Sequence, residues 1–116
     1  MSQLIPKNKY TFILGCLTTA GTVIADAAGA HKHEWPAWKK INHATASRYG
    51  MIGGVGIIIS SLVSRTVVPA ALIFGGTLCF SGSLFYKNFT DRDDVRKVTP
   101  IGGGLYILGW ASLAFL

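Results

Sequence analysis

Residues 66–86 read TVVPAALIFGGTLCFSGSLFY and lie between Arg65 and Lys87, with no charged side chain inside the stretch. A helix of about 20 apolar residues, rising about 1.5 Å per residue, is long enough to cross a lipid bilayer. A soluble helix of this length would need a polar face, and this stretch offers only small residues and a few hydroxyl groups. The stretch therefore predicts a transmembrane helix, and the rest of the chain can be interpreted against it.

Three further stretches have the composition of membrane spans, at residues 10–30, 44–64 and 100–116. Charged residues gather between these stretches, whereas a soluble domain would distribute them along every helix. The sequence therefore predicts an all-α membrane protein, a single domain over residues 1–116. Its four transmembrane helices are expected to form one compact bundle with both termini on the same side. A cleaved signal peptide is the alternative for residues 10–30, but the length of the apolar run favours a retained helix.

The segments between the spans have different lengths. Pro36 should end any helix that continues from the first span, and a short interfacial helix is expected from about Ala37. A tight turn at residues 64–66 predicts that the second and third helices are antiparallel neighbours. Pro100 is compatible with the start of the fourth span, because the N–H that proline lacks has no partner at that position.

The composition argues against a nucleic-acid-binding protein and against a structural disulfide. Half of the 116 residues are hydrophobic and 14% are charged, with a formal net charge of +6. The basic residues, apart from Arg48, lie in the tail and connectors. They lack the aromatic–basic interleaving of the kind that stacks bases, which favours contact with lipid headgroups over nucleic-acid binding. Cys16 and Cys79 lie inside apolar runs, so we expect packing roles and no structural disulfide.

Basic residues are divided unevenly between the two sides of the predicted bundle. The tail and the short turn carry three of them, whereas the two long connectors and the residues beside them carry eight. The positive-inside rule then places the long connectors on the cytosolic or mitochondrial-matrix side and both termini on the opposite side. The first set is Lys7, Lys9 and Arg65, and the second is Lys32, Lys39, Lys40, Arg48, Lys87, Arg92, Arg96 and Lys97.

Small residues recur at helical spacing in all four spans. Helices in lipid associate by close backbone approach, which small residues permit, so these positions are predicted to form the helix–helix contacts. The predicted packing residues are Gly21, Ala25 and Gly29 in the first span, Gly50, Gly53 and Gly54 in the second, Gly75, Cys79 and Gly82 in the third, and Gly102 and Gly109 in the fourth.

Asp26 and Arg48 form a candidate polar site inside the membrane, since an ionisable residue there is a functional candidate by default. They lie at similar depth on either side of the first connector, so an ion pair is one interpretation. The helical spacing points Arg48 away from the small face of its helix, which favours the other interpretation. In that interpretation Arg48 extends to the interface and Asp26 lies near water.

The connectors contain candidate lipid contacts and weak metal ligands. Aromatic and basic side chains suit the headgroup region. His31, His33 and His43 with Glu34 form only a weak metal signal, so headgroup or partner contact is preferred for them. We therefore predict no catalytic, cofactor-binding or metal-binding residues. The predicted headgroup contacts are Trp35, Trp38, Lys39, Lys40, Arg96 and Lys97.

Three short elements recur in a known order. Gly29-Ala30-His31 comes first, then Gly76-Thr77-Leu78 leading to Ser83-Leu84-Phe85-Tyr86, then Thr99-Pro100-Ile101-Gly102-Gly103 leading to Leu108-Gly109-Trp110. Together they resemble a small four-span membrane family of unknown function, which includes bacterial YwdK-like proteins and an uncharacterised eukaryotic branch. The eukaryotic branch is associated with mitochondria. The resemblance therefore implies the mitochondrial inner membrane. In that membrane the bias of the basic residues places the connectors on the matrix side and the termini on the intermembrane-space side.

The favoured hypothesis is a non-enzymatic accessory or assembly subunit of a larger inner-membrane complex, such as a respiratory complex or supercomplex. Its expected partners are other subunits of that complex and membrane lipids, cardiolipin among them. The alternative is a small homo-oligomeric transporter or channel with Asp26 in its path, beside Thr18 and Thr22. A lipid-handling protein that uses the basic connectors is a third hypothesis.

Overall fold

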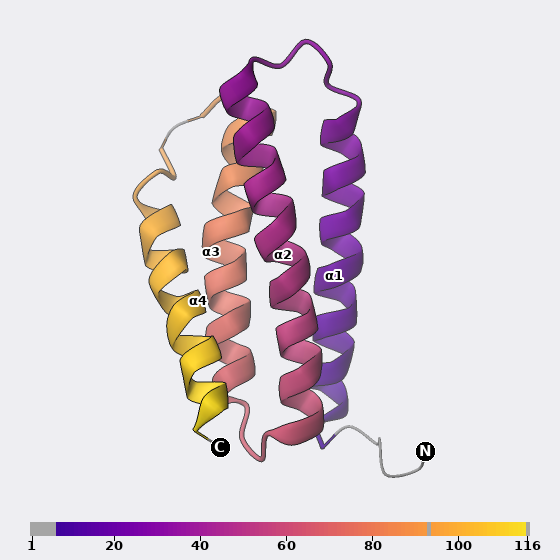
Figure 1. Cartoon of the computed structure of the whole chain (residues 1–116), viewed down its shortest axis with the longest axis vertical. Helices are drawn as coiled ribbons and strands as arrows, with labels where there is room; N and C mark the ends of the chain where they lie inside the picture. The colour runs from indigo at the N-terminus through magenta and orange to yellow at the C-terminus, as the bar shows by residue number, and fades with distance from the viewer. Residues whose placement is uncertain (1–6, 93, 116) are drawn as a thin grey trace.

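The computed structural model describes residues 7–92 and 94–115. Within these residues the chain forms four α-helices: α1 (Lys9–Ala30), α2 (Ala37–Val63), α3 (Val68–Thr90) and α4 (Val98–Ala114). The helices run alternately up and down, and the start of α1 and the end of α4 lie at the same end of the bundle (Figure 1). The predicted all-α bundle of four apolar helices is confirmed, as is the shared side of the termini. Leu116, the last residue of the predicted fourth span, lies outside the described residues.

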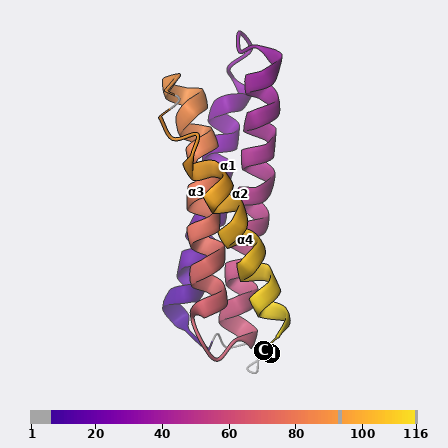
Figure 2. The ribbon, with the colours of Figure 1, turned by 90° about the vertical axis from the view of Figure 1, so that its left-hand side faces the viewer.

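The helices pack in chain order. Helix α1 packs on α2, α2 on α3, and α3 on α4, while α4 touches α2 only slightly. Helices α1 and α4 therefore lie at opposite edges (Figure 1), and α4 is inclined across its neighbours when seen from the side (Figure 2). The bundle measures 48 × 28 × 18 Å. This open arrangement leaves one side of α1 without another of the described helices packed along it.

The helix boundaries differ from the expected ones at three places. Helix α2 begins at Ala37, directly after Pro36, so the expected interfacial helix and the second span are one helix. Helix α3 continues four residues beyond residue 86 and ends at Asp91, which has left-handed backbone angles (φ 59°). Helix α4 begins at Val98, so Pro100 lies in its first turn, where missing N–H groups are tolerated. Apolar composition alone marks the span and not the polar turns that extend it.

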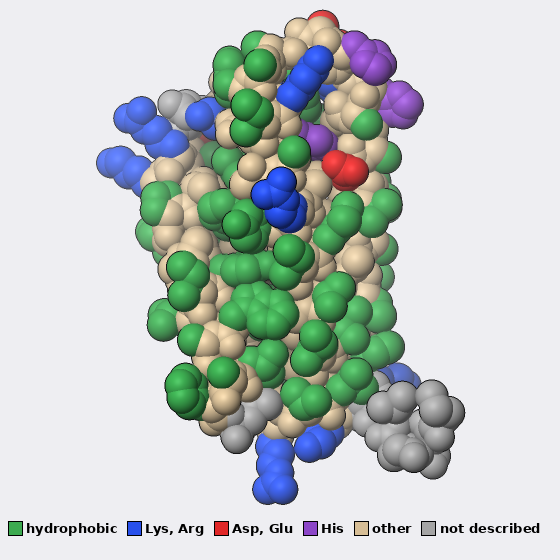
Figure 3. All heavy atoms as spheres, in the orientation of Figure 1, with side chains coloured by type: hydrophobic (Ala, Val, Ile, Leu, Met, Phe, Trp, Pro, Cys, Tyr) green, Lys and Arg blue, Asp and Glu red, His purple; other side chains and the backbone are tan. Residues whose placement is uncertain are grey.

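Three of the described helices, α1, α2 and α3, have the length and hydropathy of a membrane span, and α4 is a shorter apolar helix of 17 residues. That length is near the lower limit for crossing a bilayer. Lys and Arg side chains gather toward the two ends of the molecule, with a hydrophobic zone between them (Figure 3). A multi-pass membrane protein follows from this pattern.

The core is small and depends on glycine. Ile57, Ala70 and Ile73 are buried at its centre. A β-carbon at Gly109 would lie 2.6 Å from Ile73 Cγ1, and one at Gly102 would lie 2.7 Å from Cys79 Cβ. Real β-carbons do not approach so closely, so α3 and α4 meet backbone to backbone along this line.

The contacts of α1 and α2 use partly different residues from those predicted. A β-carbon at Gly50 would meet Thr22, one at Gly53 would meet Thr77, and one at Gly54 would meet Thr19. Gly15, which was not predicted, lies against Gly54 and Ile58 of α2. These pairs place the small face of α2 between α1 and α3.

Two predicted packing residues are wrong and a third packs only loosely. A β-carbon at Gly21 would have no neighbour within 4 Å, and one at Gly82 would touch only Leu78 of its own helix. At Gly75 it would reach only Leu105 of α4, at 3.8 Å. Small residues occur on several faces of α1 and α3, so their spacing does not identify the face that packs.

Candidate functional site at the connector end of the bundle

His43 lies buried at the connector end of α2, with 6% of its surface exposed. Its Nε2 donates a hydrogen bond to the Asp26 carbonyl oxygen over 3.1 Å and lies 3.7 Å from Asp26 Oδ1. The ring also rests on Gly29, where a β-carbon would overlap it. The other ring nitrogen, Nδ1, is buried without a hydrogen-bond partner among the described residues.

Aromatic rings enclose the remaining sides of His43. Trp35, Phe85 and Phe89 lie edge-on to it, with ring centroids 5.6, 5.2 and 5.9 Å away. The connector, α1, α2 and α3 thus all contribute to one buried polar position.

Asp26 pairs with Ser47 and not with Arg48. Ser47 Oγ donates a 2.7 Å hydrogen bond to Asp26 Oδ1. The Asp26 side chain is 46% exposed, and Arg48 is exposed on the adjoining face of α2. Of the two interpretations of these residues, the structure therefore has the one without an ion pair. Asp26, His43 and Ser47 are called the His43 cluster below.

Lys39, Asn88 and Asp91 form a second group, the Lys39 cluster. Lys39 Nζ donates to the Asn88 carbonyl oxygen at 3.3 Å and forms an ion pair with Asp91. In return Asn88 Nδ2 donates to the Lys39 carbonyl oxygen at 2.8 Å. Lys39 is only 7% exposed, so its prediction as a headgroup contact is wrong. This cluster joins the start of α2 to the end of α3.

The other predicted headgroup contacts lie at the surface, except one. Trp38 is half exposed, with the ammonium groups of Lys39 and Lys87 5.8 and 5.6 Å from its ring centroid. Lys40, Arg96 and Lys97 are exposed, whereas Trp35 is half-buried against His43.

Several hollows in the surface of the described residues could accommodate other molecules. The connector cavity, about 300 Å³, lies beside the His43 cluster and is lined by Asp26, Lys32, Trp35 and Lys40 among others. The α1–α3 groove, about 220 Å³, is lined mainly by small and apolar residues. The largest, about 680 Å³, lies at the opposite end of the bundle around Ser64 and Pro69.

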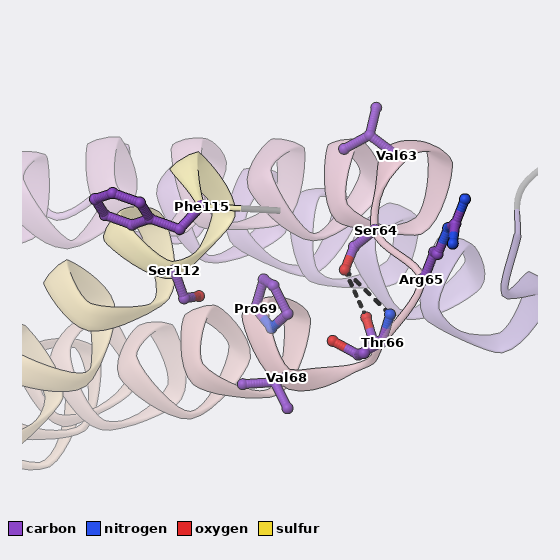
Figure 4. A pocket seen from close by; sticks show the side chains of 8 residues that line it. All are labelled: Val63, Ser64, Arg65, Thr66, Val68, Pro69, Ser112 and Phe115. Atoms are coloured by element: carbon purple, nitrogen blue, oxygen red, sulfur yellow. Dashed lines mark hydrogen bonds between the residues drawn. The ribbon is translucent and has the colours of Figure 1, made fainter.

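The largest hollow offers little chemistry. Of the described residues that line it, only Arg65 has a charged side chain. The Ser64 hydroxyl donates a hydrogen bond to the Thr66 carbonyl oxygen (Figure 4). Ser112 and Phe115 lie on the other side of Pro69 from Arg65 (Figure 4). Among residues 7–92 and 94–115, no group of three His, Cys, Asp or Glu side chains could hold a metal ion.

The sequence of this chain matches a known family of proteins. The family described as "Protein of unknown function (DUF423)" matches residues 25–103. The chain belongs to the DUF423 family. The predicted resemblance to a small membrane family of unknown function is thereby confirmed. No solved structure matches the chain.

Relatives of this DUF423 protein are bacterial membrane proteins. A UPF0382 membrane protein of Staphylococcus aureus (strain bovine RF122 / ET3-1) is 34% identical over 90% of this chain and 92% of the relative. Another, from Staphylococcus haemolyticus (strain JCSC1435), is 36% identical with the same coverage. Both names support a membrane protein. The mitochondrial address stays a prediction.

The DUF423 match includes both polar clusters, since Asp26, His43, Ser47, Asn88 and Asp91 lie within residues 25–103. The sequence predicts headgroup or partner contact for His43, and its predicted contacts do not include Ser47 or Asn88. One signal was available, because His43, Ser47 and Gly50 recur at helical spacing along α2. The partners on α1 and α3 carry no such signal in the sequence.

Proposed function

We propose that this DUF423 protein is a non-enzymatic accessory or assembly subunit of a larger membrane complex, and that it docks through the α1–α3 groove. The observation that carries the proposal is a groove at membrane depth, lined by small residues, into which no described helix of this chain packs. Gly21 and Ala25 of α1 line one wall, and Ser81 and Gly82 of α3 line the other.

Small residues have a particular value in lipid. Association between membrane helices depends on van der Waals contact and close backbone approach, because lipid tails are as apolar as leucine side chains. Gly21 leaves the groove open to an incoming helix. The Ser81 hydroxyl is buried beneath the groove and has no hydrogen-bond partner among the described residues. A partner helix with a polar side chain could satisfy it.

The finer features of the proposal rest on the sequence. A respiratory complex of the mitochondrial inner membrane is supported by the resemblance to the eukaryotic branch alone. The orientation, with connectors facing the matrix and termini facing the intermembrane space, rests on the eight-to-three division of basic residues. In a bacterium the same rule would place the connectors in the cytoplasm.

The test is native electrophoresis of gently solubilised membranes, with mass spectrometry of each band. We expect the wild-type chain to migrate in a complex larger than its own oligomers, and Gly21→Leu and Gly82→Leu to release it. Gly104→Leu is the matched control, because a β-carbon at Gly104 also meets nothing within 4 Å. A chain that migrates alone, or equal release by Gly104→Leu, would contradict the proposal.

The transporter is the second candidate, and Asp26 beside His43 is the observation that favours it. A carboxylate next to a buried imidazole is a common arrangement in proton pathways through membranes. The Thr18 and Thr22 hydroxyls, however, donate to the carbonyl oxygens of Leu14 and Thr18 in their own helix. If transport occurs, flux into liposomes should be lost in Asp26→Asn and kept in Arg48→Gln.

A further inference from the structure

We propose that the connector cavity binds the headgroup of a zwitterionic aminophospholipid, of the phosphatidylethanolamine class. The cavity lies between the last turn of α1, the connector and the first turns of α2, and has a volume of about 300 Å³. That volume is at the small end of the range for ligand pockets, which suits a headgroup whose chains stay in the bilayer.

The position of the cavity matches that of lipid headgroups. Asp26 lies one turn before the end of α1 at Ala30, where the apolar span meets the polar connector. Trp35 lines the same cavity, and tryptophan is enriched at the level of the headgroups. A lipid beside the bundle would therefore present its headgroup, and not its chains, at this depth.

The charges around the cavity are of both signs, and part of each is unpaired among the described residues. Asp26 Oδ1 accepts from Ser47, while Oδ2 has no partner among the described residues. The ammonium groups of Lys32 and Lys40 form neither an ion pair nor a hydrogen bond within residues 7–92 and 94–115, and both residues line the cavity. One free carboxylate oxygen and two free ammonium groups complement a ligand that carries an ammonium and a phosphate.

This pattern distinguishes the headgroup from two other kinds. A choline headgroup has a quaternary nitrogen without N–H donors, so it cannot hydrogen-bond to Asp26. Glycerol-based anionic headgroups, including cardiolipin, have a phosphate but no ammonium, and leave the carboxylate facing negative charge. Lys39, by contrast, is already satisfied by Asn88 and Asp91, so it adds no free positive charge.

The test uses the full chain in detergent with native mass spectrometry, against phosphatidylethanolamine, phosphatidylcholine, phosphatidylglycerol and cardiolipin of matched chains. Phosphatidylethanolamine and phosphatidylcholine differ only in the methyl groups on nitrogen. We expect about a tenfold preference for the former, as one charge-assisted hydrogen bond gives. Equal binding of the two, or a preference for the anionic lipids, would overturn the proposal.

Variants assign the preference to this cavity. Asp26→Asn should abolish the discrimination between ethanolamine and choline, and its amide oxygen can still accept from Ser47, so the fold should persist. Asp94→Asn, on the exposed second connector, is the control and should keep the discrimination. A preference for ethanolamine that survives in Asp26→Asn would refute the site.

A pair of double variants tests whether Lys32 and Lys40 bind the phosphate of the headgroup. Lys32→Gln with Lys40→Gln should weaken binding of both zwitterionic lipids about tenfold. Lys7→Gln with Lys9→Gln removes the same charge at the other end of the bundle and should leave both affinities unchanged. Equal losses in the two double variants would show general electrostatic attraction and contradict a specific site. Helical circular dichroism of every variant checks that the fold is kept.

Discussion

The imidazole of His43 in α2 rests directly on the backbone of Gly29 in α1. Its Nε2 donates a hydrogen bond to the carbonyl oxygen of Asp26, which lies one turn before Gly29 in α1. The contact fixes the rotation of α1 against α2 at the connector end. It also orders the groups around the connector cavity, because Asp26 and His43 both line it. Glycine at this position is thus a requirement of the histidine on the neighbouring helix.

Gly29→Ala should destabilise the protein, because the new methyl group would overlap a ring held between Trp35, Phe85 and Phe89. Overpacking of this kind costs about 1–3 kcal/mol. The measurement is unfolding in mixed micelles, followed by circular dichroism. Gly21→Ala, on the same helix and without a neighbour, should be neutral or slightly stabilising.

A double variant separates this overlap from a general effect of alanine. In a His43→Ala background the ring is absent, so Gly29→Ala should cost less than it does in the wild type. A coupling of at least about 0.5 kcal/mol is expected for residues in direct contact. Additive losses would show that the His43 ring is not what limits position 29.

Gly102→Ala should weaken the junction of α3 and α4. A β-carbon at position 102 would lie 2.7 Å from both the carbonyl carbon and Cβ of Cys79. Because backbone atoms cannot move aside as a side chain can, the two helices must separate. We expect the free energy of unfolding to decrease by about 2 kcal/mol or more. Gly104→Ala, two residues along the same helix, has open space and serves as the control. Comparable unfolding curves for these two variants would rule out the close approach.

Asp91 has two separable roles, as the partner of Lys39 and as the left-handed residue that ends α3. Asp91→Asn removes the charge, but asparagine tolerates the left-handed backbone angles. The free energy of unfolding should therefore decrease by about 1 kcal/mol, and this decrease should become smaller with added salt. Asp91→Ala removes both the charge and the residue that tolerates left-handed angles. It should lower the free energy of unfolding by about 1 kcal/mol more than Asp91→Asn does. Unfolding at low and high salt measures both effects. If asparagine and alanine were equally destabilising, the backbone role would be excluded.

Parts of the polar site were foreseeable. Asp26 was singled out because a carboxylate in an apolar run is costly, and the structure places it in the His43 cluster. Its partner was not foreseeable, because Ser47 and Arg48 are adjacent in sequence and only the rotation of α2 decides which of them faces α1. The Lys39–Asn88 contact joins residues 49 positions apart, and nothing in either segment indicates the other as its partner.

The sequence by itself determined the number of helices, the membrane class and the shared side of the termini. These depend on the length of apolar runs and on the position of charges and prolines, which are local properties. Only the tertiary structure decided that His43 rests on Gly29, that Asp26 pairs with Ser47, and that Gly21 borders an open groove. Those features depend on how each helix is rotated about its axis. Small residues on several faces allow more than one rotation, and the choice is made by packing across all the helices together.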